Sequence, residues 1–104
     1  MALEFTDQTV KEFIASGNPV VVDCWATWCS ACVRMMPVVE RLAETYSGKV
    51  TIGKYNVEDE TDIPADYSVR ALPTLLFFRD GKLVDRLVGS QTPEAIESRI
   101  KALL

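Results

Sequence analysis

The residues of this chain best suited to chemistry are two cysteines separated by two small residues, in Trp28-Cys29-Ser30-Ala31-Cys32. They follow an apolar run and stand at the head of a segment with helical spacing. The start of a helix favours a thiolate over a thiol, and two cysteines one turn apart can close a small disulfide ring. The pattern therefore predicts dithiol–disulfide exchange, in which Cys29 attacks and Cys32, which the helix shields, resolves the mixed disulfide.

The same pair could instead supply half of a metal site. A structural zinc site needs four ligands, but the chain has no histidine and no second C-x-x-C, and Cys24 could add only a third ligand. A cluster shared between two chains through Cys29 and Cys32 is another alternative, and it would colour the purified protein. We expect redox use and no metal. The lack of histidine also removes the usual general base and any Cys-His nucleophilic pair.

Composition limits the partners and the compartment. The 104 residues predict one domain spanning 1–104, and a net charge of −4 without a basic run argues against nucleic acid or anionic membranes as partners. We expect no signal peptide and no membrane span, since no apolar stretch is long enough. Three cysteines are too few for a disulfide scaffold and fit a reducing compartment. We therefore expect a cytoplasmic monomer.

Hydrophobic spacing predicts nine elements in the order β-α-β-α-β-α-β-β-α. They are an edge strand at Leu3 and Phe5, a helix capped by Thr6 or Asp7 that ends near Ser16-Gly17, a strand over 20–26, a helix from the redox pair to Ser47-Gly48 with Pro37 inside it, a strand over 50–55, a helix over 63–67, strands over 74–78 and 82–88, and a helix capped by Thr92. The order predicts an α/β fold with a mixed five-stranded sheet and helices on both faces.

Three segments carry more specific predictions. Residues 20–26 are apolar at nearly every position, which is typical of a central parallel strand covered on both faces. Asp80-Gly81 predicts a hairpin and therefore antiparallel pairing of the two strands that flank it. The acidic stretch from Glu58 to Asp62 is expected to be a solvated loop.

Asp23 is an anomaly in the middle of the predicted central strand. Burial there should raise its pKa, and Lys54 would oppose that shift if it lies nearby. The result would be a carboxyl group able to accept a proton, although a partly solvated carboxylate at the strand end is an alternative. By strand alternation Cys24 points to the opposite face. We interpret it as a buried core thiol, with a regulatory or resolving role as the alternative.

Further motifs occur in one order along the whole chain. They are Asp23-Cys24-Trp25-Ala26-Thr27-Trp28-Cys29, Cys32 with Pro37 five residues later, Leu72-Pro73-Thr74, Asp80-Gly81 and Val88-Gly89. Together they resemble the thioredoxin family, for which C-x-x-C near a βαβ pattern is a known signature. The resemblance implies a thioredoxin fold and protein-disulfide reductase activity. It also implies no bound cofactor, because electrons would come from NADPH through a thioredoxin reductase.

The resemblance also implies roles for single residues. Asp23 would take the proton of Cys32 through water, and Lys54 matches a lysine of the family. The Leu72-Pro73 bond would be cis and face the cysteines, and the Leu72 backbone would pair with an extended segment of a substrate protein. From the sequence alone, a trans proline at the start of a strand stays open.

An apolar patch for substrate proteins is a further implication. Trp28, Leu72, Val88 and Gly89 would line it around Cys29. Trp28 and Trp25 could instead be packing residues.

The two residues between the cysteines depart from the Gly-Pro found in most thioredoxins. If Cys29 caps the helix, the N–H of Ala31 can point at its thiolate, whereas a proline has no N–H to offer. Ser30-Ala31 should therefore lower the pKa of Cys29 and make the protein more oxidising, while Val33, in place of a common lysine, acts in the opposite direction. The alternatives to a reductase are thus a more oxidising oxidase or isomerase, or a non-catalytic module that binds partners through the patch.

Overall fold

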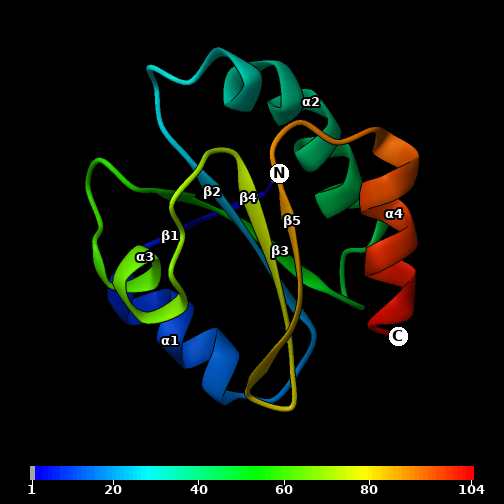
Figure 1. Cartoon of the computed structure of the whole chain (residues 1–104). Helices are drawn as coiled ribbons and strands as arrows, with labels where there is room; N and C mark the ends of the chain where they lie inside the picture. The colour runs from blue at the N-terminus through cyan, green and yellow to red at the C-terminus, as the bar shows by residue number, and fades with distance from the viewer. Residues whose placement is uncertain (1) are drawn as a thin grey trace.

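The chain forms one five-stranded sheet that is covered by helices on both faces (Figure 1). The computed structural model describes residues 2–104. The elements are β1 (Leu3–Phe5), α1 (Asp7–Ala15), β2 (Val20–Trp25), α2 (Ser30–Thr45), β3 (Thr51–Asn56), α3 (Asp62–Tyr67), β4 (Thr74–Arg79), β5 (Lys82–Val88) and α4 (Pro93–Ala102). The predicted order of elements is confirmed.

The sheet has the strand order β1-β3-β2-β4-β5, with β2 at its centre. β2 runs parallel to β3, with Asp23 opposite Lys54, and antiparallel to β4, with Asp23 opposite Leu75. The prediction of a parallel central strand is therefore correct on one side only. The reason is that β4 begins beside the carboxyl end of β2, where Thr74 pairs with Cys24, and runs back along it. The predicted hairpin between β4 and β5 is confirmed.

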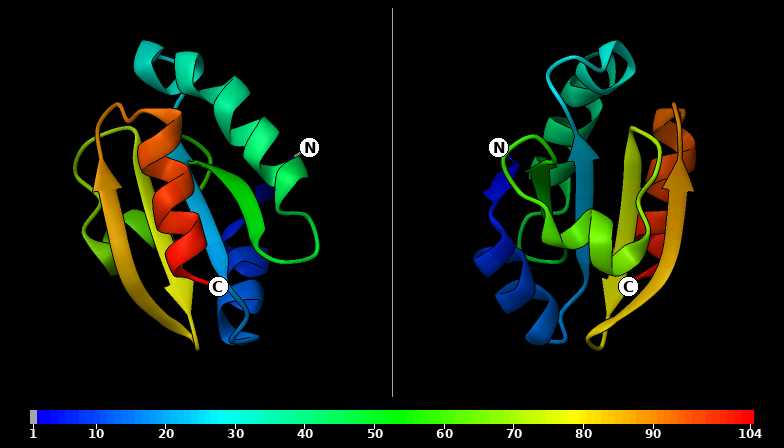
Figure 2. Two further views of the ribbon diagram at one scale, coloured as in Figure 1. Left: turned by 90° about the vertical axis from the view of Figure 1, so that its right-hand side faces the viewer. Right: turned by 60° about the vertical axis from the view of Figure 1, so that its left-hand side comes forward.

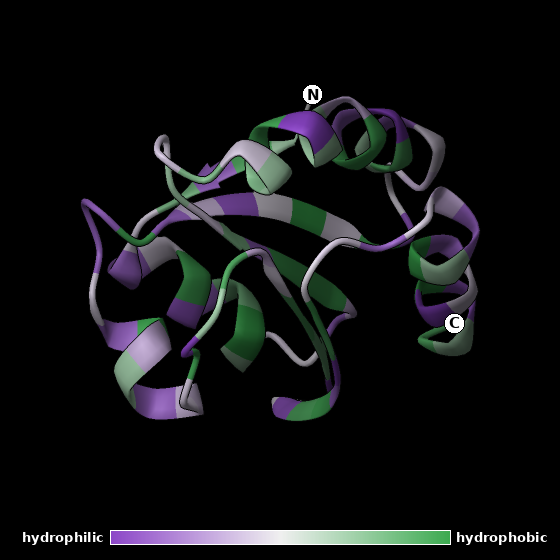
Figure 3. Ribbon diagram, turned by 45° about the horizontal axis from the view of Figure 1, so that its top comes forward, coloured by the Kyte–Doolittle hydropathy of each residue, from purple (hydrophilic) through white to green (hydrophobic). Residues whose placement is uncertain are grey.

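Each face of the sheet has its own hydrophobic core. Residues of α2 and α4 pack with Val21 and Leu75 on one face, and residues of α1 and α3 pack with Val22 and Leu76 on the other. Figure 2 shows the helices on the two sides, and Figure 3 shows hydrophobic and hydrophilic residues alternating along them, as in amphipathic helices.

Strand alternation places the two chemically active residues of β2 on different faces. Asp23 belongs to the face under α2, as Val21 does, and Cys24 is fully buried in the core of the opposite face. Burial raises the pKa of the Cys24 thiol to about 12. Cys24 is therefore a free, protonated core thiol, as predicted.

Three helices begin at the predicted caps. The side chain of Thr6 accepts the N–H of Thr9 at the start of α1, and Thr92 does the same for Ala95 at the start of α4. Cys29 is the N-cap of α2. Such caps satisfy backbone N–H groups that have no partner in the first turn of a helix.

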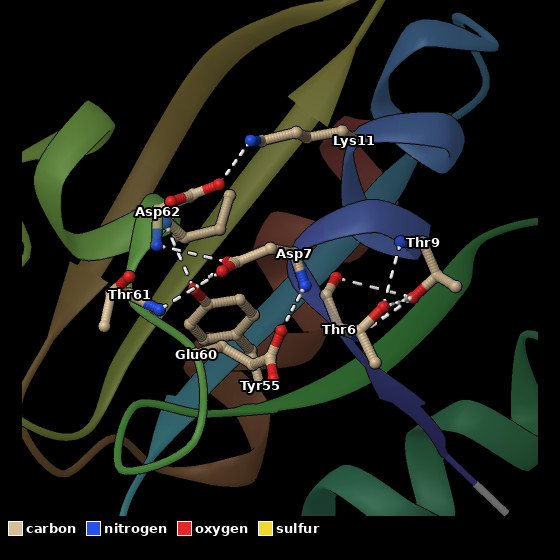
Figure 4. A network of polar contacts seen from close by, with 9 residues as sticks. Thr6, Asp7, Thr9, Lys11, Tyr55, Glu60, Thr61 and Asp62 are labelled. Carbon is tan, nitrogen blue, oxygen red and sulfur yellow. Dashed lines mark hydrogen bonds and ion pairs between the residues drawn. The ribbon is translucent and has the colours of Figure 1, made fainter.

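The acidic stretch 58–62 is an exposed to half-buried loop that leads into α3, as predicted, but two of its carboxylates also bind groups of α1. Glu60 accepts the backbone N–H of Asp7 at 2.5 Å, and Asp62 pairs with Lys11. Figure 4 shows this network between the start of α1 and the start of α3. The physical reason is that the first turn of α1 exposes unpaired N–H groups, which attract carboxylates from the nearby loop.

Gly53 lets β1 lie close against β3. It pairs with Leu3 and is buried, and a Cβ atom at this position would overlap the ring of Phe5. A glycine inside a strand often marks such a close approach. The Phe5 ring of β1 thereby fills the space that a side chain at residue 53 of β3 would occupy.

Candidate active site

The redox pair lies at one end of the sheet, between β2 and α2. In Figure 1 the connection from β2 to α2, the segment that leads into β4 and the segment that follows β5 all lie at this end. The arrangement follows from strand direction, because β2 and β5 end there and β4 begins there. Segments from three parts of the sequence therefore surround the two cysteines.

Cys29 and Cys32 are joined by a disulfide, with their Cα atoms 5.3 Å apart. Cys29 caps α2, and its Sγ accepts the backbone N–H of Cys32 at 3.2 Å. Cys29 is 8% exposed and Cys32 only 1% exposed. Cys29 is thus the more exposed residue of the pair, and Cys32 lies deeper, in the first turn of α2.

Ala31 occupies the second position of α2, where a backbone N–H has no carbonyl partner within the helix. In the disulfide form, the hydrogen bond to Cys29 Sγ comes from Cys32 and not from Ala31. The expectation that the Ala31 N–H faces a thiolate concerns the reduced protein, so it stays a prediction.

Ala31→Pro tests that prediction. Removing one N–H near the thiolate should shift the equilibrium with reduced and oxidised glutathione toward the oxidised protein by about tenfold, the value of one hydrogen bond to a charged group. Val33→Lys is the matched control. Val33 is exposed, and a lysine there adds positive charge without changing a backbone donor, so it should shift the equilibrium toward the reduced protein. An unchanged equilibrium in Ala31→Pro would contradict the role of the N–H.

Asp23 is a buried carboxyl group without a hydrogen-bond partner. It is 1% exposed, and neither of its oxygens is bonded to another residue within 2–104. Burial raises its pKa to about 7, while Lys54 acts to lower the pKa and Glu40 to raise it. The predicted direction is confirmed. The alternative of a partly solvated carboxylate is wrong, because Asp23 lies between β3 and β4 under α2.

Lys54 forms an ion pair with Glu40, which the sequence analysis did not identify. The Lys54 Nζ lies 2.9 Å from Glu40 Oε2, and Glu40 Oε1 accepts the backbone N–H of Ala2 at 2.5 Å. One signal could have found Glu40. A lysine between two buried strand residues needs an opposite charge, and α2, which covers that face, has only two carboxylates in its sequence, one of them Glu40.

The Leu72-Pro73 peptide bond is cis, as the family resemblance implied. Leu72 packs against the small cluster that contains Cys29 and Cys32. The carbonyl of Pro73 accepts the N–H of Gly89 at 2.8 Å. The structure therefore brings Leu72, Pro73 and Gly89 together at the end of the sheet that carries the redox pair.

Apolar side chains are exposed near the disulfide. Trp28 is 71% exposed and lines a shallow cavity of about 250 Å³ together with Leu72. The other residues that line it are Val57, Pro64, Val69, Arg70 and Ala71. Val88 is also exposed, at the end of β5. The packing interpretation is thus wrong for Trp28 and correct for Trp25, which packs against the cysteine cluster.

Glu58 is a second residue that the sequence analysis missed. Its Oε1 accepts the N–H of Thr27 at 2.6 Å and the hydroxyl of Thr27 at 2.8 Å. These two hydrogen bonds lower the pKa of the Glu58 carboxyl group. They hold the backbone directly before Trp28 and Cys29.

Within 2–104, no group of three or more His, Cys, Asp or Glu side chains is arranged to hold a metal ion. No helix in this part of the chain is long and apolar enough to cross a membrane.

Sequence comparison decides the family. The family model for thioredoxin matches residues 1–102. The chain belongs to the thioredoxin family. The thioredoxin of Chlorobaculum thiosulfatiphilum is 40% identical over 98 residues, which cover 93% of this chain and 91% of that protein. Thioredoxin 1 of Synechococcus elongatus is 41% identical over 91 residues, or 86% of this chain and 85% of that protein.

Solved structures agree with this assignment. The crystal structure of oxidised mitochondrial thioredoxin 3 from Saccharomyces cerevisiae is similar, with a TM-score of 0.86, 31% sequence identity and coverage of 97% of this chain and 94% of that chain. The chain therefore has the thioredoxin fold. Thioredoxin family membership together with the Cys29–Cys32 pair makes this protein a thiol–disulfide oxidoreductase.

Proposed function

We propose that this protein reduces disulfides in other proteins and is itself reduced by a thioredoxin reductase with electrons from NADPH. The observation that carries the proposal is the position of Cys29. It is the N-cap of α2 and the more exposed residue of a redox pair, beside exposed apolar side chains. The two thiols can hold both electrons, so the reaction needs no bound cofactor.

The first step forms a mixed disulfide. The Cys29 thiolate attacks one sulfur of the substrate disulfide, the sulfur–sulfur bond of the substrate breaks, and its second sulfur leaves as a thiolate that takes a proton from water. The N-terminus of α2 favours the attacking thiolate, because its unpaired N–H groups and the helix dipole stabilise negative charge.

The second step releases the substrate. Cys32 loses its proton to Asp23 through water, and its thiolate attacks Cys29 Sγ. The mixed disulfide breaks, the substrate leaves with both sulfurs reduced, and Cys29 and Cys32 are oxidised to the disulfide. A pKa of about 7 suits Asp23 to this role, because a general base works best when its pKa is near the operating pH.

Substrate proteins would bind at the end of the sheet around Cys29. An extended segment would pair with the backbone of Leu72 beside Pro73, and its apolar side chains would lie on Trp28, Val88 and Gly89. The exposure of Trp28 and Val88 and the contact of Leu72 with the cysteine cluster support this placement. We further propose that the protein acts as a monomer in the cytoplasm, since its redox pair requires a reducing compartment to be recharged.

The test is a coupled assay with a bacterial thioredoxin reductase, NADPH and insulin as the disulfide substrate. We expect NADPH oxidation, followed by its absorbance at 340 nm, to depend on this protein and to consume one NADPH for each disulfide reduced. No NADPH consumption would contradict the proposed function. Ser30-Ala31 favours a second candidate, an oxidase or isomerase, which an equilibrium titration with glutathione would identify by a more oxidising potential.

A further inference from the structure

An ion pair between Lys54 and Glu40 lies near Asp23, and the proposed mechanism gives it no role. The charged groups that act on Asp23 are Lys54 from β3 and Glu40 from α2, while β4 presents the apolar Leu75. Although Lys54 lies directly opposite Asp23 in the sheet, its ammonium group binds Glu40, and both oxygens of Asp23 stay without a partner in the described chain.

The position of Glu40 is fixed from two sides. One of its oxygens accepts the backbone N–H of Ala2 and the other binds Lys54, and the ion pair is partly buried between α2 and the sheet. A lysine side chain has four flexible carbons and would otherwise be free to turn toward the nearest carboxylate. Because a backbone donor holds Glu40, the ammonium of Lys54 is held with it.

Whether Lys54 binds the carboxylate of Glu40 or that of Asp23 matters for proton transfer. An ammonium group bonded directly to Asp23 would favour its charged form and make it a weaker base. We propose that Glu40 is a positioning residue for the redox reaction, which binds Lys54, prevents it from pairing with Asp23 and so keeps Asp23 able to take the proton of Cys32. This inference rests on the proposed role of Asp23 as proton acceptor.

Glu40→Gln tests the positioning role without relying on activity. Glutamine has nearly the same shape and can still accept the N–H of Ala2, but it does not carry the charge that holds Lys54. In the oxidised protein, we expect the titration midpoint of the Asp23 carboxyl carbon, followed by NMR, to fall by about one pH unit, as it does for a carboxylate that gains a nearby cation. An unchanged midpoint would overturn the proposal.

A second comparison separates positioning by Lys54 from the charge of Glu40 itself. In a Lys54→Gln background, Glu40→Gln should move the Asp23 midpoint by less than half as much, because no ammonium is left to redirect. An equal shift in both backgrounds would show that Glu40 acts directly on Asp23 and would overturn the inference. Glu40→Asp keeps the charge and should restore most of the wild-type midpoint.

The pH profile of insulin reduction links this arrangement to the reaction. For Glu40→Gln we expect the profile to move to lower pH together with the Asp23 midpoint, while a profile that stays in place would contradict the link. Asp23→Asn separates the role of Asp23 as proton acceptor from the positioning of Lys54 by Glu40. If Asp23→Asn leaves the profile unchanged, Asp23 is not the proton acceptor, whereas the NMR midpoints still decide whether Glu40 positions Lys54.

Discussion

Cys29→Ser is expected to abolish insulin reduction, with a loss of turnover on the order of a thousandfold or more, as for other removed nucleophiles. A serine hydroxyl does not ionise near neutral pH and cannot form a disulfide, so both the attack and the storage of electrons are lost. The decrease should appear in the NADPH-coupled assay and also with dithiothreitol as reductant, because neither reductant restores the missing sulfur.

Two further cysteine variants make this experiment specific. Cys32→Ser keeps the attacking thiol but lacks the resolving one, so it should accumulate a mixed disulfide with insulin that mass spectrometry detects. Cys24→Ser is the matched control, because Cys24 is buried in the core on the opposite face of the sheet, and it should keep activity if it folds. Turnover by Cys29→Ser above a tenth of the wild-type rate would refute its role as nucleophile.

Asp23→Ala is expected to stabilise the fold at pH 8 and to slow turnover. Folding raises the pKa of Asp23 from its ordinary value of 3.8 to about 7, so the folded state holds a proton that the unfolded chain has released. Wild-type stability therefore falls as the pH rises from about 4 to about 7, and at pH 8 the buried charge costs about 4 kcal/mol relative to acid. Removing the carboxyl group removes that cost.

The measurement is urea unfolding at pH 8 and at pH 5. Asp23→Ala should be more stable than the wild type by about 2 to 4 kcal/mol at pH 8. At pH 5 this gain should be smaller by about 2.5 kcal/mol, because Asp23 is then protonated in the folded wild type while the unfolded chain has still released the proton. Asp66→Ala, which removes an exposed carboxylate, should show a similar change at both pH values. An Asp23→Ala variant that is less stable than the wild type at pH 8 would contradict the buried charge.

Local rules were enough to predict most of the elements and the centre of the site. Alternation along β2 separated Asp23 from Cys24, the position of Cys29 before a helical segment predicted its capping role, and Asp80-Gly81 predicted the hairpin. Each of these depends on neighbours within a few residues. The cis Leu72-Pro73 bond followed only from family resemblance, because most X-Pro bonds are trans.

The polar contacts between distant segments could not be predicted in this way. Glu40 meets Ala2 and Lys54 only because α2 packs over β3 and beside Ala2, and Glu60 reaches Asp7 across 53 residues of sequence. Hydrophobic periodicity shows which face of a helix is buried, but it does not show which charged side chain at the edge of that face meets a partner. These contacts therefore required the tertiary structure.

The hydrogen bond from Ala2 to Glu40 has a practical consequence for how the protein is prepared. It connects the backbone at the start of the chain, through Glu40 and Lys54, to the surroundings of Asp23. An affinity tag or fluorescent label fused ahead of Ala2 would be attached directly beside the backbone N–H that binds Glu40. The α4 helix contributes no charged group that acts on Asp23. A fusion placed after α4 therefore leaves the hydrogen bond between Ala2 and Glu40 intact, and it is the better choice for measurements of redox kinetics.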